Sequence, residues 1–354
     1  MNILLLGDGG WGTALAILLA EKGHQVVLWG AFPEYVAQMR QMRENTRFLP
    51  GVQLPPTVEL VADMGPAMAA ADLLVFSTPV VYLRRVAECA RQFYRPGLPV
   101  MSVAKGIEND TLLCGSSIIR ECLGTPPVLR GTGGGHSAAG PLLDVAVLSG
   151  PSHAEEVARH LPATVVAAAR EPDFARFIQQ TFMSPWFRVY TSDDPLGVEL
   201  AGALKNVIAI AAGISDGLGL GDNAKAALLT RGLAEITRLG VALGSRPETF
   251  AGLAGIGDLI TTCISPYGRN LAVGRAIAQG RKLEEILAEL RGMVPEGVWT
   301  ARAVVELARR HNVEMPISEQ VYRVLFENKS PRQAVADLMS RGPRPERDEE
   351  LAVE

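Results

Sequence analysis

A lysine stands where a solvated cation is not expected. Lys205 lies in the middle of Gly197–Ala212, a run of small and apolar residues that predicts a buried helix. Burial lowers the pKa of a lysine, and such a lysine can exchange a proton with a carbonyl group near neutral pH. The alternative is that Lys205 extends its ammonium along the helix surface to water. We favour proton transfer as its chemistry.

Two further candidates follow predicted strands. Lys105 comes directly after the apolar run Val100–Ala104, and the turn Ser149–Ala154, which contains Gly150 and Ser152, ends the run Val145–Ser149. Ligands of open α/β sheets bind at the carboxyl ends of the strands. The backbone N–H groups of such a turn can hold ligand oxygens. The alternatives are a solvated lysine at a strand end and an ordinary strand-to-helix turn.

A third set of polar residues lies in the C-terminal half. Asp258 follows two glycines that permit close backbone approach, and Arg269 offers a planar guanidinium suited to phosphate, with Thr262 and Asn270 as neutral donors. The alternatives are a helix N-cap for Asp258 and a surface arginine. The segment Val294–Gly297 either folds back over a cofactor or only leads into a helix.

A glycine motif at the N-terminus predicts a dinucleotide site. Residues Gly7–Gly12 fit G-x-G-x-x-G and follow the predicted strand Asn2–Leu6, and a helical pattern continues to Lys22. In this motif Gly7 permits a tight turn, Gly9 lets the backbone approach the pyrophosphate, and Gly12 lets helix and strand pack closely. The helix N-terminus then presents N–H groups to phosphate. Because the motif lies between a strand and a helix, we prefer this interpretation to an ordinary turn.

The sequence leaves the choice between NAD and NADP open. An acid at the end of the second strand, Gln25–Trp29, would favour NAD, and an arginine there would favour NADP. Ala31 and Phe32 follow instead, Glu34 comes late, and the nearest arginines are Arg40 and Arg43.

Strands and helices alternate in the first half of the chain, which predicts a parallel, doubly wound sheet. From about Pro195 only helical patterns remain. We therefore predict a Rossmann-type α/β dinucleotide-binding domain at residues 1–191, an all-helical substrate domain at 192–340 and a flexible tail at 341–354. The predicted strands are Asn2–Leu6, Gln25–Trp29, Leu73–Ser77, Val100–Ala104, Val145–Ser149, Ala163–Ala168 and Phe187–Tyr190. The predicted helices are Gly12–Lys22, Val80–Phe93, Gly197–Ala212, Asn223–Leu243, Asn270–Gln279, Lys282–Arg291, Thr300–Arg310, Ile317–Glu327 and Pro331–Met339.

Composition narrows the class of protein. The chain has 354 residues, 48% of them hydrophobic, and a net charge of −4, so no basic field favours nucleic acid or an anionic membrane. Four cysteines without CxxC spacing and five scattered histidines predict reduced thiols and no metal site. No signal peptide or membrane span is expected, which predicts a cytoplasmic protein. The glycine-rich segment 124–140 is expected to be a surface insertion rather than a phosphate loop.

Taken in order, these motifs resemble one family. Gly7–Ala16, Ala104–Glu108, Ser149–Ala154, Leu204–Ile210, Gly255–Cys263 with Arg269-Asn270, Val294–Gly297 and Glu314–Ile317 are similar to the matching segments of NAD(P)-dependent glycerol-3-phosphate dehydrogenases. The likeness runs from about residue 1 to residue 340. It implies reduction of dihydroxyacetone phosphate to sn-glycerol 3-phosphate, a helical domain like the C-terminal domain of 6-phosphogluconate dehydrogenase, a homodimer, and a role in phospholipid synthesis.

The resemblance also implies a role for each matching residue. Lys205 would be the general acid/base. The substrate would contact Lys105, Gly150, Ser152, Lys205, Asp258, Thr262, Gly268, Arg269 and Asn270. The cofactor, NAD or NADP, would contact Gly7, Gly9, Gly10, Trp11, Gly12, Lys105, Ala154, Arg269, Val294 and Glu296.

The chain departs from the family pattern in places. Bacterial members commonly carry serine where this chain has Gly10 and Gly268, and a basic residue where it has Ala31-Phe32; the glycines around Gly131–Gly135 are an addition. Two alternatives to the implied function stay open. One is a dehydrogenase of the same type for another 2-keto or 2-hydroxy acid, and the other is a dinucleotide sensor without catalysis.

Overall fold

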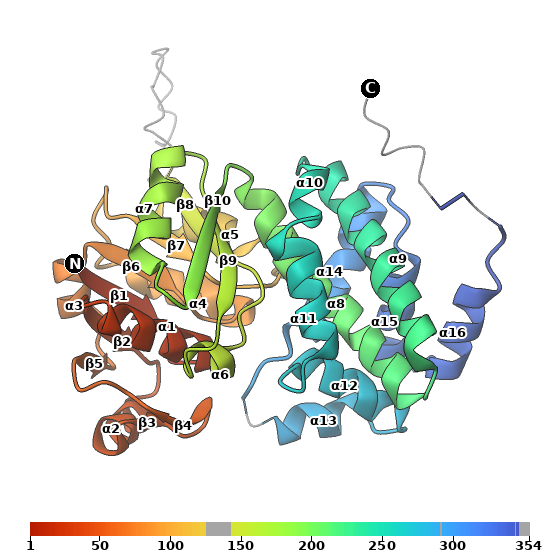
Figure 1. Cartoon of the computed structure of the whole chain (residues 1–354), viewed down its shortest axis with the longest axis horizontal. Coiled ribbons are helices and arrows are strands. Elements are labelled where there is room, and N and C mark those ends of the chain that lie inside the picture. Colours follow the sequence, from red (N-terminus) through yellow and green to blue (C-terminus); the bar gives the residue numbers. More distant parts are fainter. Residues whose placement is uncertain (125–142, 291, 344, 347–354) are drawn as a thin grey trace, which may run out of the picture. The chain divides into compact units, whose positions relative to one another are not determined.

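The chain forms two compact units in the computed structural model (Figure 1), which describes residues 1–124, 143–290, 292–343 and 345–346. The first unit comprises Met1–Ala104 and the described part of Leu113–Pro195, and the second comprises Lys105–Leu112 and the described residues from Leu196 onward. Lys105 thus clusters with the helical unit, although the chain places it inside the predicted first domain. The expected insertion lies outside the described residues except for Gly124, as does most of the expected tail.

An eight-stranded sheet forms the centre of the first unit, in the order β10-β9-β8-β7-β6-β1-β2-β5. Its strands are β1 (Asn2–Leu6), β2 (Gln25–Trp29), β5 (Val58–Val61), β6 (Leu73–Phe76), β7 (Val100–Ser102), β8 (Val145–Ser149), β9 (Ala163–Ala168) and β10 (Phe187–Ser192). A separate antiparallel pair joins β3 (Glu44–Asn45) and β4 (Leu49–Gln53).

The sheet is parallel except where β8 pairs with β9. The segment between these two strands contains only α6 (Ala154–Val157), a helix of four residues. Parallel neighbours normally need a full crossover helix, so this short connection returns the chain antiparallel.

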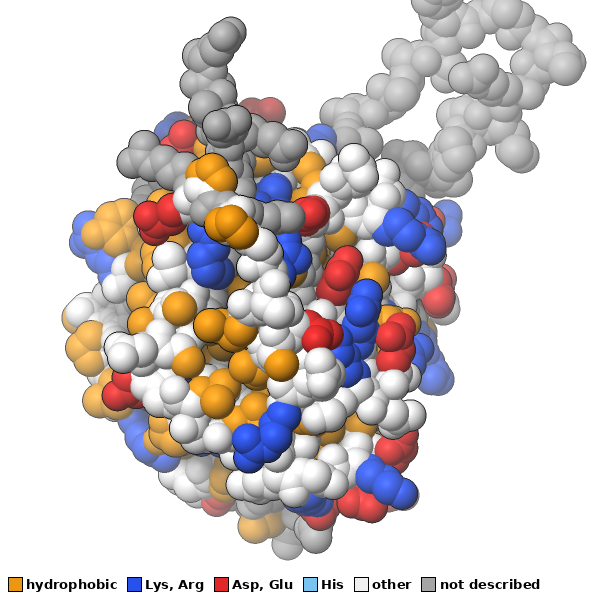
Figure 2. Space-filling model, turned by 90° about the vertical axis from the view of Figure 1, so that its right-hand side faces the viewer, with side chains coloured by type: hydrophobic (Ala, Val, Ile, Leu, Met, Phe, Trp, Pro, Cys, Tyr) orange, Lys and Arg blue, Asp and Glu red, His pale blue; other side chains and the backbone are white. Residues whose placement is uncertain are grey.

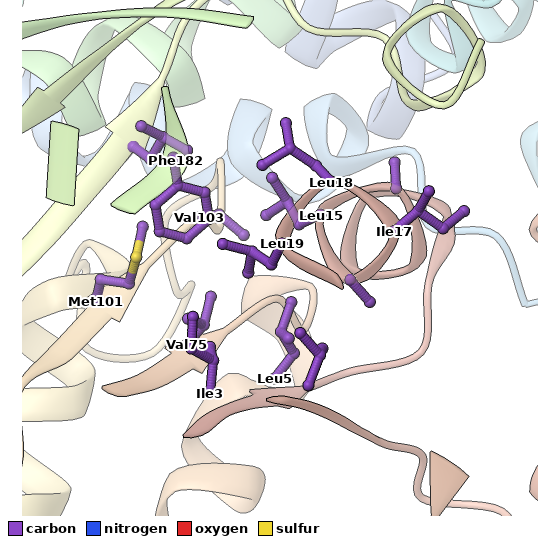
Figure 3. Close-up of a cluster of buried hydrophobic side chains, with 14 of the residues drawn as sticks. Ile3, Leu5, Leu15, Ile17, Leu18, Leu19, Val75, Met101, Val103 and Phe182 are labelled. Atoms are coloured by element: carbon purple, nitrogen blue, oxygen red, sulfur yellow. The ribbon is translucent and has the colours of Figure 1, made fainter. Parts of the chain in front are cut away.

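Helices pack on the sheet because its strands are apolar on both faces. They are α1 (Gly10–Glu21), α2 (Pro33–Met42), α3 (Gly65–Ala70), α4 (Val80–Arg91), α5 (Gly115–Leu123), α6 and α7 (Pro172–Phe182). Figure 3 shows Leu15 and Leu19 of α1 facing the sheet side chains Leu5, Val75 and Met101, all fully buried. This packing fixes α1, and with it the glycine loop, against β1.

Apart from the segment Lys105–Leu112 and the connecting loops, the described part of the second unit is helical. It contains α8 (Pro195–Gly217), α9 (Gly221–Ala242), α10 (Pro247–Phe250), the π-helix η1 (Leu253–Gly257), α11 (Asp258–Ile264), α12 (Arg269–Ala278), α13 (Leu283–Glu289), α14 (Glu296–Arg310), α15 (Pro316–Phe326) and α16 (Pro331–Met339). Among the described helices α8 alone is long and apolar enough to cross a membrane, and 94% of its apolar window is buried in the fold. Such burial is typical of a core helix.

A buried carboxylate ties two helices of this unit together. Glu235 of α9 accepts hydrogen bonds from the backbone N–H of Ile317, at 2.6 Å, and of Ser318, at 3.2 Å. These donors belong to the first turn of α15, where backbone N–H groups have no partner within the helix. Burial raises the pKa of Glu235 to about 7, against the hydrogen bonds that lower it.

Candidate active site

The glycine loop after β1 has the geometry that close backbone approach requires. Gly7 has φ +127°, and a Cβ there would lie 2.9 Å from the backbone of Thr78. A Cβ on Gly12 would lie 2.1 Å from the carbonyl oxygen of Gly7, so only glycine lets α1 pack this closely on the loop.

The N-terminus of α1 is available to an anion. Gly9 is its N-cap, no side chain caps it, and its first turn holds no acidic residue. A Cβ on Gly9 would meet nothing within 4 Å, which leaves open space beside the loop. The residues present therefore fit the pyrophosphate of a dinucleotide, held by backbone N–H groups and the positive end of the helix dipole.

The neighbours of this loop explain one departure from the family. A Cβ on Gly10 would lie 2.5 Å from the carbonyl oxygen of Phe48 and 3.7 Å from the Cβ of Ala154. A serine at residue 10 would thus collide with the segment before β4. The ring of Trp11 lies 6.3 Å from that of Phe187 and packs against the core. Trp11 belongs to the first turn of α1, where backbone N–H groups have no partner within the helix.

The turn after β8 is held by its own hydrogen bond. Gly150 has φ +136°, and a Cβ there would lie 2.9 Å from the Cα of Val165. The hydroxyl of Ser152 donates to the carbonyl oxygen of Gly150 at 2.9 Å. These contacts hold the shape of the turn, so the hydroxyl of Ser152 has a structural role.

The two arginines after β2 donate hydrogen bonds to backbone carbonyl oxygens. Arg40 donates from Nε to the carbonyl oxygen of Leu60 at 2.6 Å. Arg43 donates to the carbonyl oxygens of Pro55 and, at 2.9 Å, Val58. Both guanidinium groups thus hold the segment that contains β5, an edge strand of the sheet.

Four polar side chains gather at the buried centre of the second unit. Asp258, whose side chain is 4% exposed, accepts from the ammonium of Lys205 at 2.8 Å and from that of Lys105 at 2.7 Å. Lys205 also donates to the hydroxyl of Thr262, one helical turn beyond Asp258 on α11. The π-helix η1 leads directly into Asp258, as such helices often do at functional sites.

The charges in this cluster set the protonation of Lys205. Burial lowers the pKa of Lys205 to about 8, because desolvation and the charge of Lys105 outweigh the attraction of Asp258. Burial alone would raise the pKa of Asp258, but the two lysines hold it below its ordinary value. Two ammonium groups share one carboxylate, which leaves one positive charge in excess. With a pKa of about 8, Lys205 is protonated at neutral pH, and such an ammonium can act as a proton donor.

Cys263 follows Thr262 and is buried. Burial raises the pKa of its thiol to about 12, so the thiol stays protonated.

A chain of side-chain amides surrounds the cluster. Asn206 donates to the carbonyl oxygen of Lys105 at 3.2 Å and accepts from Asn270 at 3.0 Å. Asn270 in turn accepts from the backbone N–H of Gly297, in the first turn of α14, at 3.0 Å. A Cβ on Gly297 would lie 2.4 Å from the carbonyl oxygen of Asn206, so glycine is required at this contact. Asn270 thus joins three segments of the site.

Arg269 is an exposed cation of the second unit. It begins α12, and its side chain forms no hydrogen bond or ion pair within the part of the chain that the structure describes. The turn before it lies against α11, because a Cβ on Gly268 would be 2.9 Å from the carbonyl oxygen of Thr262. Val294 is buried, and Glu296 begins α14.

A strand–glycine loop–helix unit for a dinucleotide, with a separate helical unit that buries a proton-donating lysine, defines a nicotinamide-dependent dehydrogenase. Two family models match the chain, the N-terminal model of NAD-dependent glycerol-3-phosphate dehydrogenase at residues 2–175 and the C-terminal model at residues 194–336. The chain belongs to this family.

Individual relatives agree over almost the whole chain. A protein of Salinibacter ruber named glycerol-3-phosphate dehydrogenase [NAD(P)+] 2 is 48% identical over 345 residues, 98% of this chain and 96% of its own length. One of Geobacter metallireducens, named glycerol-3-phosphate dehydrogenase [NAD(P)+], is 49% identical over 346 residues, covering 98% and 99%. The crystal structure of glycerol-3-phosphate dehydrogenase from Coxiella burnetii has a TM-score of 0.87 at 36% identity, covering 96% of this chain and 98% of that one.

A structure of D-mandelate dehydrogenase with NADH and anilino(oxo)acetate shares only the fold, at 14% identity and a TM-score of 0.59.

Sequence reasoning missed two residues that the structure brings into view. Asn206 was passed over although it stands beside Lys205 in an apolar helix, where a buried amide needs partners. Asp8 was passed over although it is a charged residue inside the glycine loop.

Proposed function

We propose that this chain reduces dihydroxyacetone phosphate to sn-glycerol 3-phosphate, with Lys205 as the general acid. The observation that carries the proposal is the buried contact of Lys205 and Lys105 with Asp258. The glycine loop of the first unit would hold NADH or NADPH, which supplies the hydride when bound.

Residues of the second unit would donate the proton and stabilise the developing charge. Lys205 donates a proton from its ammonium to the carbonyl oxygen of the ketone, and this oxygen becomes the hydroxyl group of the product. Asp258 orients that ammonium and favours its charged state, and Lys105 supplies the second cation beside the developing negative charge. In the reverse direction a neutral Lys205 accepts the proton.

Arg269 would bind the phosphate of the substrate. Its exposure and its lack of a partner in the described structure support this role, as does a guanidinium that matches phosphate geometry. Thr262 and Asn270 already have partners in the second unit, so we assign to them mainly the orientation of Lys205 and of α14.

The remaining contacts follow from the family resemblance. Gly7, Gly9, Gly10, Trp11 and Gly12 would bind the pyrophosphate through backbone, and Ala154, Val294 and Glu296 would touch the cofactor. The open space at Gly9 supports the first set.

The proposed reaction is tested by the absorbance of NADH or NADPH with dihydroxyacetone phosphate. Oxidation of either cofactor that depends on this substrate is expected. A screen of 2-keto acids serves as the comparison, and turnover of a keto acid in preference to the phosphorylated ketone would refute the assignment.

We also propose a cytoplasmic homodimer that supplies glycerol 3-phosphate for phospholipid synthesis. The dimer follows from the family resemblance; Figure 2 shows one face of the protein, on which apolar side chains lie among charged and polar ones. Light scattering on a sized sample is expected to give twice the 37.8-kDa mass of the chain. A monomer at micromolar concentration would refute the dimer without affecting the proposed reaction.

A further inference from the structure

Asp8 has a carboxylate oxygen without a hydrogen-bond partner. Its Oδ2 is buried and unpaired within the described structure, while its backbone carbonyl accepts from Asn45 at 2.7 Å. A buried carboxylate without a donor is costly, and such a group often awaits a ligand. Its position inside the glycine loop restricts which ligand that can be.

The carboxylate of Asp8 occupies the space beside the end of β2. A Cβ on Gly30, the residue after β2, would lie 2.4 Å from Oδ2 of Asp8. Gly30 does not have a positive φ, so the space taken by Asp8, and not backbone conformation, requires glycine here. The acid that usually recognises the ribose hydroxyls projects from this end of the second strand. In this structure the carboxylate of Asp8, from the loop before α1, occupies that space.

The residues that follow β2 do not take this position. Ala31 and Phe32 follow Gly30, and Arg40 and Arg43 are bound to the backbone around β5. Burial raises the pKa of Asp8, and the charge of Arg47 opposes that rise.

We propose that Asp8 accepts a hydrogen bond from the adenosine ribose of the dinucleotide and so favours NADH over NADPH. This inference rests on the proposed function, since it assumes that the glycine loop binds a dinucleotide. The 2′-hydroxyl of NADH is the donor, and the 2′-phosphate of NADPH brings a second negative charge against the carboxylate.

Titration calorimetry with NADH, NADPH and 2′-deoxy-NADH tests the proposal without reference to turnover. The wild-type protein is expected to bind NADH about tenfold or more tightly than 2′-deoxy-NADH, the factor that a hydrogen bond to a charged group provides. Asp8→Ala is expected to weaken NADH to the level of the deoxy compound. Asp8→Asn, which keeps the volume beside Gly30, is expected to bind NADPH more tightly than the wild type.

Glu34→Gln serves as the matched control, because Glu34 is an exposed carboxylate in the first turn of α2. Equal wild-type affinities for NADH and 2′-deoxy-NADH would overturn the assignment of Asp8, and so would a changed preference in Glu34→Gln but not in the Asp8 variants. In both cases the dinucleotide still binds, so the proposed function survives. Failure of the wild type to bind any dinucleotide would instead overturn the proposed function itself.

Discussion

Replacing Lys205 by methionine removes the buried ammonium but keeps a side chain of similar length. We expect the reduction rate constant kcat to fall about 10²–10⁴-fold, the usual contribution of a positioned acid. Cofactor affinity should stay within a few fold, because the glycine loop belongs to the other unit.

The structure indicates that this variant still folds. The pKa of Lys205 falls from 10.5 to about 8 on burial, which corresponds to about 3 kcal/mol of folding free energy. Because the pKa is lower in the folded state, this cost is complete below about pH 8 and disappears as the pH rises toward 10.5. Methionine removes this cost, which already includes the attraction of Asp258 for the ammonium. Asp258 keeps Lys105 as a partner, so its carboxylate is not left without a cation.

The pH dependence of wild-type turnover gives a second measurement. Reduction needs the protonated lysine, so its rate should be level below about pH 8 and fall above it. Oxidation of glycerol 3-phosphate needs the neutral lysine and should rise through the same pH. Both inflections should be absent from Lys205→Met.

Lys329→Met is a suitable control, because Lys329 also pairs with an aspartate, Asp337, but next to α16. Steady-state rates, calorimetric NADH affinity and thermal unfolding of the two variants complete the comparison. A Lys205→Met variant that folds and retains more than about a tenth of wild-type kcat would refute the assignment.

Other substitutions test separate parts of the site and fold. Arg269→Ala should raise KM for dihydroxyacetone phosphate about 10- to 150-fold, which corresponds to about 1.5–3 kcal/mol, and leave KM for unphosphorylated dihydroxyacetone nearly unchanged; equal effects would exclude phosphate binding by Arg269. Values of kcat/KM should favour NADH over NADPH by less than about 100-fold, because Asp8 offers a single hydrogen bond while Ala31 and Phe32 add neither acid nor cation, and a greater ratio would contradict this. Burial raises the pKa of Glu235 to about 7, so the free energy of unfolding of the wild type should fall by up to about 3 kcal/mol relative to Glu235→Gln as the pH rises from 4.5 to 7. Denaturant unfolding measures this difference, and the same pH dependence of stability in both proteins would contradict it.

Apolar runs predicted the buried strands closely. The ranges of β1, β2, β8 and β9 agree with the sequence patterns, because strands buried on both faces form nearly continuous apolar runs. The edge strand β5 was missed, since its four residues alternate between buried and exposed and follow two prolines. Helix α10 and the π-helix after it were also missed, because glycines interrupt the helical period there. Helix α11 was expected only as a helix that Asp258 would cap, and its N-cap is Gly257.

The candidate site could also be predicted only in part from local sequence. A lysine inside an apolar helix was visible from local sequence, and its burial and lowered pKa agree with that prediction. The contact of Lys105 with Asp258 joins positions 153 residues apart, which no local pattern can predict. The family resemblance named both residues but gave no reason for their pairing. The structure supplies it as one carboxylate shared by two cations.

The amides around this cluster have a consequence for enzymes that run in both directions. Lys205 changes its charge in each turnover, and a frame built from carboxylates and ammonium groups would respond to that change. The links from Lys105 through Asn206 and Asn270 to Gly297 contain no group that gains or loses a proton. The hydrogen bonds that position α14 therefore keep the same donors and acceptors when Lys205 changes its charge and when the pH of the medium changes.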